Sequence, residues 1–445
     1  MHAHIISILG FWLGTSGQSL DCDLGQLDEA ALELAAFRLP RDKDVYVELE
    51  LTGGSTGEKT RLLVSDVSGS WKISADRSGS WRWELVSGDA TLSYAPTARR
   101  QPLYDGAVHR LGFSLHPERK EARLYFDGSN VAIYSVDGGS VSAKPGLVIG
   151  DGLGERGRRL RIDTEPLSGM EIFGPTGETP NVLRVLAWNI WHGGRENGDR
   201  LGVQQVIDVI RDSQADIVCM QETYGSGPEI ADALGFYFFL RSSNLSIMSR
   251  FPIGETIDLY QPFRFGGAEI HAGDLALNVF SLWIHYLPSV REQLEQESCT
   301  PDSLIAAEWE TRASEMRDIL EELRPQLADT DRRTLLVAGD FNSASHLDWT
   351  METAGRPFHR GHVVRWPVSD LCVGAGLIDG FRTVHSNPEM HPGVTWSPRF
   401  GYTHRIDYVY HKGPRLIPRL ARVIDSHAAR FPSDHAAVLV EYEVR

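Results

Sequence analysis

Six apolar runs in the second part of the chain each end in an amide, a carboxylate or an imidazole. In chain order, these polar residues are Asn189, Glu222, His285, Asp340 with Asn342, Asp407, and Asp434 with His435. Each apolar run is typical of a buried strand, and ligands of layered α/β folds collect beyond strand ends. We therefore expect these residues, which are distant in sequence, to converge on one site.

The residue types predict metal-dependent chemistry. Three carboxylates, Glu222, Asp340 and Asp434, repel one another unless a cation lies between them, and an oxygen-donor set of this kind suits Mg²⁺ or Mn²⁺. Two imidazoles, His285 and His435, supply a base and an electrophile. A metal, a base, a positioned water and an imidazole donor are the groups that phosphoester hydrolysis needs.

Structural explanations exist for each motif taken alone. Asp340 with Asn342 could form an Asx turn after a strand, and Asp434 with His435 could cap the last strand. Six such motifs in one domain, each beside an apolar run, favour a catalytic site. For His192 a structural role competes with a place in the site lining. Three tryptophans fit either an apolar substrate wall or the core: Trp349, Trp366 and Trp396.

The elements that position these residues form an α/β domain. Strands are predicted at 183–190, 216–221, 334–338, 406–410 and 436–444, and helical faces at 203–210 and 316–323. This domain is expected over residues 181–445, after a turn-rich linker at 175–180. A polar insertion at 288–307 is expected to overhang the cleft as a loop or a mobile helix.

Residues 1–174 instead read as many short strands with turns between them. Strands are predicted at 45–51, 60–67, 71–74, 81–86, 109–115, 122–126 and 130–136. Hairpin-type turns follow at Asp127-Gly128, Asp137-Gly138 and Asp151-Gly152. This pattern predicts an all-β sandwich. Residues 5–13 are interpreted as a first strand rather than the apolar segment of a signal peptide.

The ordered set in the second part closely resembles the endonuclease/exonuclease/phosphatase superfamily, over about residues 183–445. The resemblance implies a four-layered α/β sandwich of the DNase I type. It implies that Glu222, Asn189 and Asp434 bind the metal and that His435, polarised by Asp407, is the general base. Three further roles are implied: Asp340 positions the water, Asn342 contacts the phosphate, and His285 donates to the phosphate or the leaving group.

The first part shows a second resemblance. The segments Asp105-Gly106, His109-Arg110-Leu111 and Tyr125-Phe126-Asp127-Gly128-Ser129 resemble laminin-G/concanavalin-like jelly rolls. Members of that group bind sugars or proteins through loops, so the resemblance implies a glycan or protein ligand for an N-terminal accessory domain. It also suggests an extracellular or cell-envelope location, although no clear signal peptide is present.

Composition limits the partners. The 445 residues have a formal net charge of −16 and 42% hydrophobic residues, as in a globular protein. No apolar run reaches the roughly 18 to 20 residues of a transmembrane helix. The excess of acidic residues disfavours binding to nucleic acid but does not exclude a nuclease. The leading interpretation is a hydrolase of a small or lipid-derived phosphoester; the alternatives are a metal-dependent nuclease of DNA or RNA, and a binding protein whose α/β domain is inert.

Overall fold

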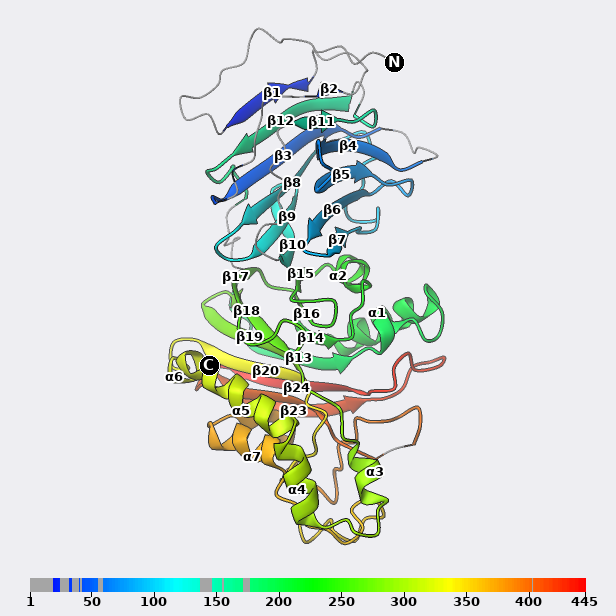
Figure 1. Ribbon diagram of the computed structural model, residues 1–445, viewed down its shortest axis with the longest axis vertical. Helices are drawn as coiled ribbons and strands as arrows, with labels where there is room; N and C mark the ends of the chain where they lie inside the picture. The colour runs from blue at the N-terminus through cyan, green and yellow to red at the C-terminus, as the bar shows by residue number, and fades with distance from the viewer. Residues whose placement is uncertain are drawn as a thin grey trace. The chain divides into compact units, whose positions relative to one another are not determined.

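The computed structural model describes residues 19–24, 32–33, 40, 42–54, 59–136, 146–153, 156–170, 177–401 and 403–445. It divides into two compact units (Figure 1): Met1–Gly174 with Ala231–Tyr237, and Pro175–Ile230 with Phe238–Arg445. The segment predicted as a first strand, 5–13, lies outside the described residues, as do Gly174 and the start of the expected linker. No helix among the described residues is long and apolar enough to cross a membrane.

The N-terminal unit consists mainly of antiparallel strands. They are β1 (Leu20–Asp23), β2 (Leu32–Glu33), β3 (Val45–Thr52), β4 (Arg61–Asp66), β5 (Trp71–Ala75), β6 (Trp81–Ser87), β7 (Ala90–Tyr94), β8 (Val108–His116), β9 (Glu121–Phe126), β10 (Ser129–Ser135), β11 (Leu147–Ile149) and β12 (Gly157–Asp163). Within this unit the strand orders are β1-β12-β3-β8-β9-β10 and β2-β11-β4-β5-β6-β7. All seven strands predicted by the alternating pattern are confirmed within a few residues.

Aromatic side chains join the two N-terminal sheets. Phe113 of β8 lies 4.9 Å from Trp71 of β5 and 6.2 Å from Trp83 of β6, measured between ring centroids. All three side chains are fully buried, so they form the core between the sheets. Asp127 and Gly128, both at positive φ, connect β9 to β10 as the two-residue hairpin that their sequence predicts.

The C-terminal unit is the predicted α/β structure of the DNase I type. Its strand orders are β15-β16-β14-β13-β24-β23 and β17-β18-β19-β20-β22-β21. The strands are β13 (Val182–Asn189), β14 (Ile217–Gln221), β15 (Tyr237–Leu240), β16 (Ser246–Ser249), β17 (Ile253–Ile257), β18 (Phe265–Ala272), β19 (Leu275–Trp283), β20 (Thr334–Asp340), β21 (Ile378–Asp379), β22 (Asp407–Lys412), β23 (Leu416–Ile424) and β24 (Ala437–Val444).

Helices complete this unit. They are α1 (Leu201–Ser213), α2 (Gly227–Leu234), α3 (Val290–Leu294), α4 (Pro301–Trp309), α5 (Arg312–Glu322), α6 (Arg324–Ala328), α7 (Pro367–Gly374) and α8 (Gly380–Val384), with a short 3-10 turn, η3 (His192–Gly194). Helices α5 and α7 lie side by side (Figure 1) and share one hydrophobic core with β19, β20 and β22. The buried face of α1 contains Val203, Val206, Ile207 and Ile210, as the helical spacing predicts.

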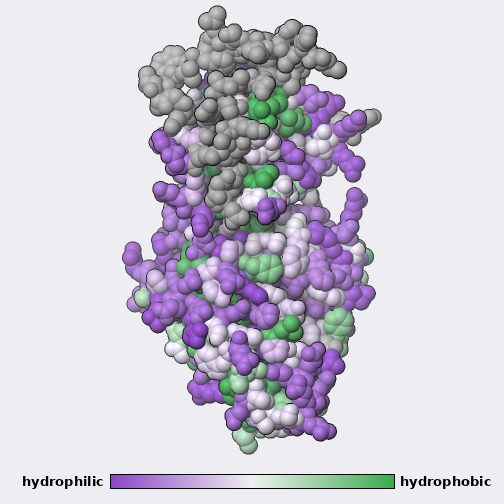
Figure 2. Space-filling model, in the orientation of Figure 1, coloured by the Kyte–Doolittle hydropathy of each residue, from purple (hydrophilic) through white to green (hydrophobic). Residues whose placement is uncertain are grey.

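The insertion at 288–307 is more ordered than a loop. It contains α3 and the first part of α4, whose Val290, Leu294 and Leu304 pack in a second small core. That core includes Trp349 and Trp366, which are 3% and 0% exposed. The substrate-wall interpretation is therefore wrong for these two tryptophans, because they pack inside the fold. On the face of the molecule seen in Figure 2, hydrophilic residues predominate and hydrophobic residues are scattered.

Candidate active site

Both C-terminal sheets present polar residues in the same arrangement. The central strand β13 ends at Asn189, which pairs with Gln221 of the parallel strand β14, and β13 is antiparallel to β24. The central strand β20 ends at Asp340, which pairs with Trp283 of the parallel strand β19 and with Asp407 of the antiparallel strand β22. Because β13 contacts β20 and β22 contacts β24, these strand ends converge.

His435 is the most constrained group of the site. Its Nδ1 lies 3.0 Å from Asp407 Oδ2, and its Nε2 lies 3.8 Å from Asp340 Oδ2. Burial alone would lower the pKa of His435, but the facing carboxylates of Asp407 and Asp340 raise it to about 10. For Asp340, burial and the neighbouring Asp407 raise the pKa to about 7, although His435 opposes the change.

Asn189 lies between two carboxylates. Its Nδ2 donates to Glu222 Oε1 at 3.1 Å and to Asp340 Oδ2 at 3.2 Å, while its Oδ1 accepts the Trp191 N–H at 3.0 Å. The other oxygen of Glu222, Oε2, accepts the His192 N–H at 2.9 Å. In this orientation the Asn189 amide links the two carboxylates through its two N–H groups. To ligate a metal through Oδ1, its amide would have to turn over.

Asp434 provides the observation that fits a cation. Its Oδ2 accepts from Trp396 Nε1 at 3.3 Å, but its Oδ1 is buried and has no hydrogen-bond partner among the described residues. Burial raises the pKa of Asp434, and the negative charge of Glu222 raises it further. A buried carboxylate oxygen without a donor, close to a second carboxylate, is costly unless it is protonated or binds a cation.

A second set of oxygen and nitrogen atoms could also hold a metal. One ligand atom each from Asp340, Asp407 and His435 lies within 4.8 Å of the others, and all three residues are buried. Of the predicted ligands, Asn189 contacts both Glu222 and Asp340, so the predicted set adjoins this second set. A divalent cation bound at such a site would supply Lewis-acid stabilisation of charge on a phosphate oxygen.

Asn342 and His285 lie at the ends of the adjacent strands β20 and β19. Asn342 Nδ2 donates to the Ile284 carbonyl at 2.9 Å and to Asp340 Oδ2 at 3.2 Å, so its amide is fixed beside the site. His285 follows Ile284, and its Nδ1 lies 3.2 Å from Arg264 Nη2. These contacts join Asn342 to Asp340, whereas Nδ1 of the His285 ring contacts Arg264.

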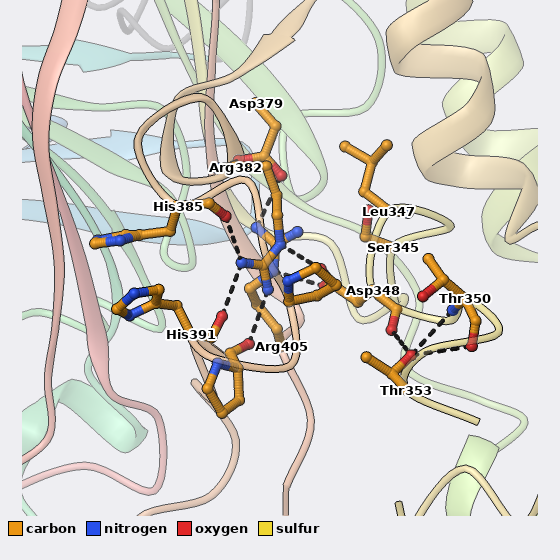
Figure 3. Close-up of polar contacts among 12 residues, drawn as sticks. Ser345, Leu347, Asp348, Thr350, Thr353, Asp379, Arg382, His385, His391 and Arg405 are labelled. Carbon is orange, nitrogen blue, oxygen red and sulfur yellow. Dashed lines mark hydrogen bonds and ion pairs between the residues drawn. The ribbon is translucent and has the colours of Figure 1, made fainter. Parts of the chain in front are cut away.

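Several residues behind the site were not predicted. Asp348 accepts from Arg382 Nε at 2.5 Å and from Arg405 Nε at 2.7 Å, and Arg405 Nη1 donates to Asp379 Oδ2 at 2.8 Å (Figure 3). We call these four buried residues the ion-pair cluster. Arg405 lies two residues before Asp407, so the cluster anchors the start of β22.

The ion-pair cluster also fixes the loop that leads to Trp396. The Arg382 guanidinium donates to the carbonyls of His385, His391 and Pro392, at 2.8 to 3.1 Å (Figure 3). Further along this loop, Thr395 Oγ1 accepts the Asp407 N–H at 3.2 Å. The chain that leads into Asp407 is therefore held in place. Only a three-dimensional structure shows this, because Asp348 and Arg405 are far apart in sequence.

Other candidate residues have different surroundings. The His192 ring is exposed and contacts Glu196, whereas its backbone N–H donates to the Glu222 carboxylate of the site. Three nearby arginines that could contact a phosphate have other partners: Arg356 binds the Pro388 and Glu389 carbonyls, Arg360 the Leu294 carbonyl, and Arg365 Asp370. Trp396 is half-buried and contacts Asp434, so it alone of the three tryptophans reaches the site.

The fold and the site together define a class of phosphoesterases. The sequence profile of the Endonuclease/Exonuclease/phosphatase family matches residues 186–435, which is more than half of the chain. The protein therefore belongs to the endonuclease/exonuclease/phosphatase family and is a metal-dependent phosphoester hydrolase. The match assigns no family to the β-rich N-terminal region.

A relative and several solved structures each match about three-fifths of the chain. The Caenorhabditis elegans protein F14F9.5, described as uncharacterized, is 26% identical over 299 residues, which cover 59% of this chain and 92% of that protein. TDP2 from C. elegans is 17% identical, with 59% of this chain and 74% of that chain covered and a TM-score of 0.41. The catalytic domain of human Nocturnin with bound sulfate is 15% identical, with 60% and 97% covered and a TM-score of 0.39.

Proposed function

We propose that this protein hydrolyses a small or lipid-derived phosphoester by in-line attack of water, with His435 as the general base. The observation that carries the proposal is the pairing of His435 Nδ1 with Asp407 at 3.0 Å, which leaves Nε2 on the side of Asp340. A base must have one nitrogen free toward water and the other held by a partner. Asp340 then orients the water that His435 deprotonates once its ring is neutral, a state that a cation bound beside these carboxylates would favour by lowering the raised pKa of His435.

The other roles follow from position. Glu222 and Asp434 hold Mg²⁺ or Mn²⁺, and Asn189, which already touches Glu222, joins them if its amide turns over. Asp434 Oδ1 has no hydrogen-bond partner among the described residues, which supports a metal site at Glu222 and Asp434. The alternative site at Asp340, Asp407 and His435 is less suitable, because His435 Nδ1 already contacts Asp407. Asn342 contacts the phosphate, and His285 donates a hydrogen bond to a phosphate oxygen or to the departing oxygen.

Aromatic residues near the site support a substrate with an apolar group. Phe263 and Tyr286 flank Trp283, with ring centroids 5.7 and 6.0 Å from it, and Phe400 lies 5.9 Å from Trp191. Phe263, Tyr286 and Phe400 are 39%, 54% and 51% exposed. Together with the net charge of −16, these side chains favour a compact or lipid-derived ester over a long polyanion.

The test is hydrolysis of bis(p-nitrophenyl) phosphate and p-nitrophenyl phosphate with Mg²⁺ or Mn²⁺, with the His435→Ala variant as the control for contaminating enzymes. We expect activity in the wild type that EDTA abolishes. A panel of sphingomyelin, sugar phosphates, single-stranded DNA and RNA then distinguishes the substrate classes. Preference for DNA or RNA over every small or lipid ester would replace this proposal with the nuclease alternative. Full activity in EDTA would contradict the metal role.

We also propose that the N-terminal unit is an accessory module of jelly-roll type that binds a glycan or a protein. Its two packed antiparallel sheets support this, since binding domains of many kinds share a sandwich architecture. A glycan array probed with the full-length His435→Ala protein tests glycan binding. Crosslinking followed by mass spectrometry tests protein binding. Failure of both would leave the unit without the proposed binding role.

A further inference from the structure

Arg264 contacts the Nδ1 nitrogen of the His285 ring. It directly precedes β18, and its carbonyl accepts the Trp283 N–H at 2.9 Å, so it lies opposite the end of β19. Its Nη2 is 3.2 Å from His285 Nδ1, and its guanidinium lies over the Trp283 ring at 4.8 Å. These contacts fix the guanidinium beside the imidazole.

Glu315 of α5 holds both residues. Its Oε2 accepts the His285 backbone N–H at 2.8 Å, and its Oε1 lies 3.7 Å from Arg264 Nε. The Glu315 carboxylate and the Arg264 side chain are each less than one-fifth exposed. The backbone and the ring of His285 are therefore both held by the ion pair between Glu315 of α5 and Arg264.

The chemistry of the partner determines which nitrogen of His285 carries the proton. A guanidinium has only N–H donors and stays protonated in proteins, so His285 Nδ1 must be the acceptor. The proton of the neutral ring is then on Nε2. His435 has the opposite partner, because the Asp407 carboxylate only accepts and the neutral ring must keep its proton on Nδ1.

We propose that Arg264 is a positioning residue that holds His285 as the Nε2–H tautomer, and that Glu315 holds Arg264 in place. The two histidines are thereby prepared for opposite tasks: His435, when its ring is neutral, offers a lone pair on Nε2, and His285 offers a hydrogen on Nε2. The catalytic consequence rests on the proposed function, in which His285 donates to the phosphate or the leaving group. The tautomer itself does not depend on it.

The direct test is the tautomer, measured by long-range ¹H–¹⁵N NMR on protein labelled at histidine, with His285→Asn used to assign the signal. Wild-type protein should show His285 protonated on Nε2, and Arg264→Met should shift the population toward Nδ1–H. A wild-type Nδ1–H tautomer, or an unchanged population in Arg264→Met, would overturn the proposal. This measurement needs no activity, so an inactive wild type would refute the proposed function and leave the tautomer assignment tested.

Kinetics provide the second test. Arg264→Met should lower kcat by about tenfold to a hundredfold with KM changed by less than about threefold, and Arg264→Lys, which still donates, should recover most of the rate. The double variant Arg264→Met/His285→Ala should be no slower than His285→Ala, because both changes remove one interaction. Arg317→Met, at an exposed position on α5, is the matched control. Additive losses, or equal losses in the methionine and lysine variants, would refute the positioning role.

If Arg264→Met does not fold, the comparison is made with Arg264→Gln and Arg264→Lys. Glutamine can accept as well as donate, so it should allow both tautomers, whereas lysine should preserve Nε2–H. Identical tautomer populations in these two variants would contradict the proposal.

Discussion

His435 Nδ1 lies 3.0 Å from Asp407 Oδ2, although the two residues belong to different sheets. Asp407 begins β22, and His435 lies in the chain that enters β24. Neither side chain has meaningful contact with solvent, since Asp407 is fully buried and His435 is 6% exposed. A carboxylate in these surroundings can stabilise the positive charge that a histidine base acquires during proton transfer. The packing of the two sheets therefore creates the base, which neither sheet contains alone.

Asp407→Asn should damage turnover more than binding. The amide can donate to His435 Nδ1, which would leave the proton on the wrong nitrogen, and it no longer stabilises the imidazolium. We expect kcat to fall on the order of a hundredfold to ten-thousandfold with a small change in KM. Steady-state kinetics on the same phosphoester would check this, with circular dichroism as the folding control. A raised KM at wild-type kcat would show that Asp407 acts on substrate binding instead.

Glu222→Gln should weaken metal binding and keep the fold. The amide oxygen can replace one ligand atom but carries no charge, and its size matches the carboxylate. Half-maximal activation should require on the order of tenfold or more Mg²⁺, and isothermal titration calorimetry should show the same loss of affinity. Glu196→Gln, at the partner of the exposed His192 ring, is a control of the same chemistry. An unchanged Mg²⁺ requirement would remove Glu222 from the ligand set.

Asp348→Asn should destabilise the protein strongly. Asp348 is 6% exposed and accepts from both Arg382 and Arg405, so the variant leaves two buried guanidinium groups short of negative charge. The free energy of unfolding should fall by about 3–5 kcal/mol in urea denaturation. The control is Asp370→Asn in the exposed pair with Arg365, which should change it by less than about 1 kcal/mol. If the two substitutions lowered the free energy of unfolding equally, burial of the ion-pair cluster would add no stability.

Acid should destabilise the protein through buried neutral histidines. Burial lowers the pKa of His404 from 6.5 to about 3, and it lowers that of His359 and of His411 to about 4. Because these folded values lie below the unfolded one, their stabilisation is complete above pH 6.5 and is lost as the pH falls toward the folded values.

His404→Phe isolates this effect. The new ring can keep the packing against Phe358, at a centroid distance of 3.7 Å, but does not titrate. Below pH 6.5, the wild type should lose stability relative to the variant by up to about 1.4 kcal/mol per pH unit. Denaturant titrations at pH 7.5, 6.0 and 5.0 measure the difference. Parallel curves for the two proteins would contradict the assignment.

The ends of two strands could be predicted from sequence, because an apolar run stops there at a polar residue. Val182–Asn189 and Thr334–Asp340 are apolar strands, and the first strong polar residues beyond their cores, Asn189 and Asp340, are the ones that meet. The alternating pattern likewise indicated the N-terminal strands. The short strand β7 was missed, since Ala90–Tyr94 combines small and polar residues with no clear alternation.

Support from across the fold could not be predicted. Arg264 and Glu315 belong to elements that meet only through packing, and nothing in the local sequence distinguishes Arg264 from the many exposed arginines. The burial of Trp349 and Trp366 could not be predicted from sequence either, because an apolar side chain is equally suited to a core and to a substrate wall. The structure corrects that alternative through the second core formed with α3 and α4.

Four non-glycine residues at the site have a left-handed backbone: Trp191, His192, Glu222 and Asn342, at φ of 57°, 50°, 55° and 47°. Such conformations cost roughly 1–2 kcal/mol for side chains other than Gly, Asn and Asp. Selection for heat resistance alone would therefore favour glycine or asparagine at positions 191, 192 and 222. Directed evolution toward thermostability, carried out without an activity screen, would weigh the backbone cost at position 222 only against the two hydrogen bonds that Glu222 accepts, and would give no weight to its proposed part in metal binding.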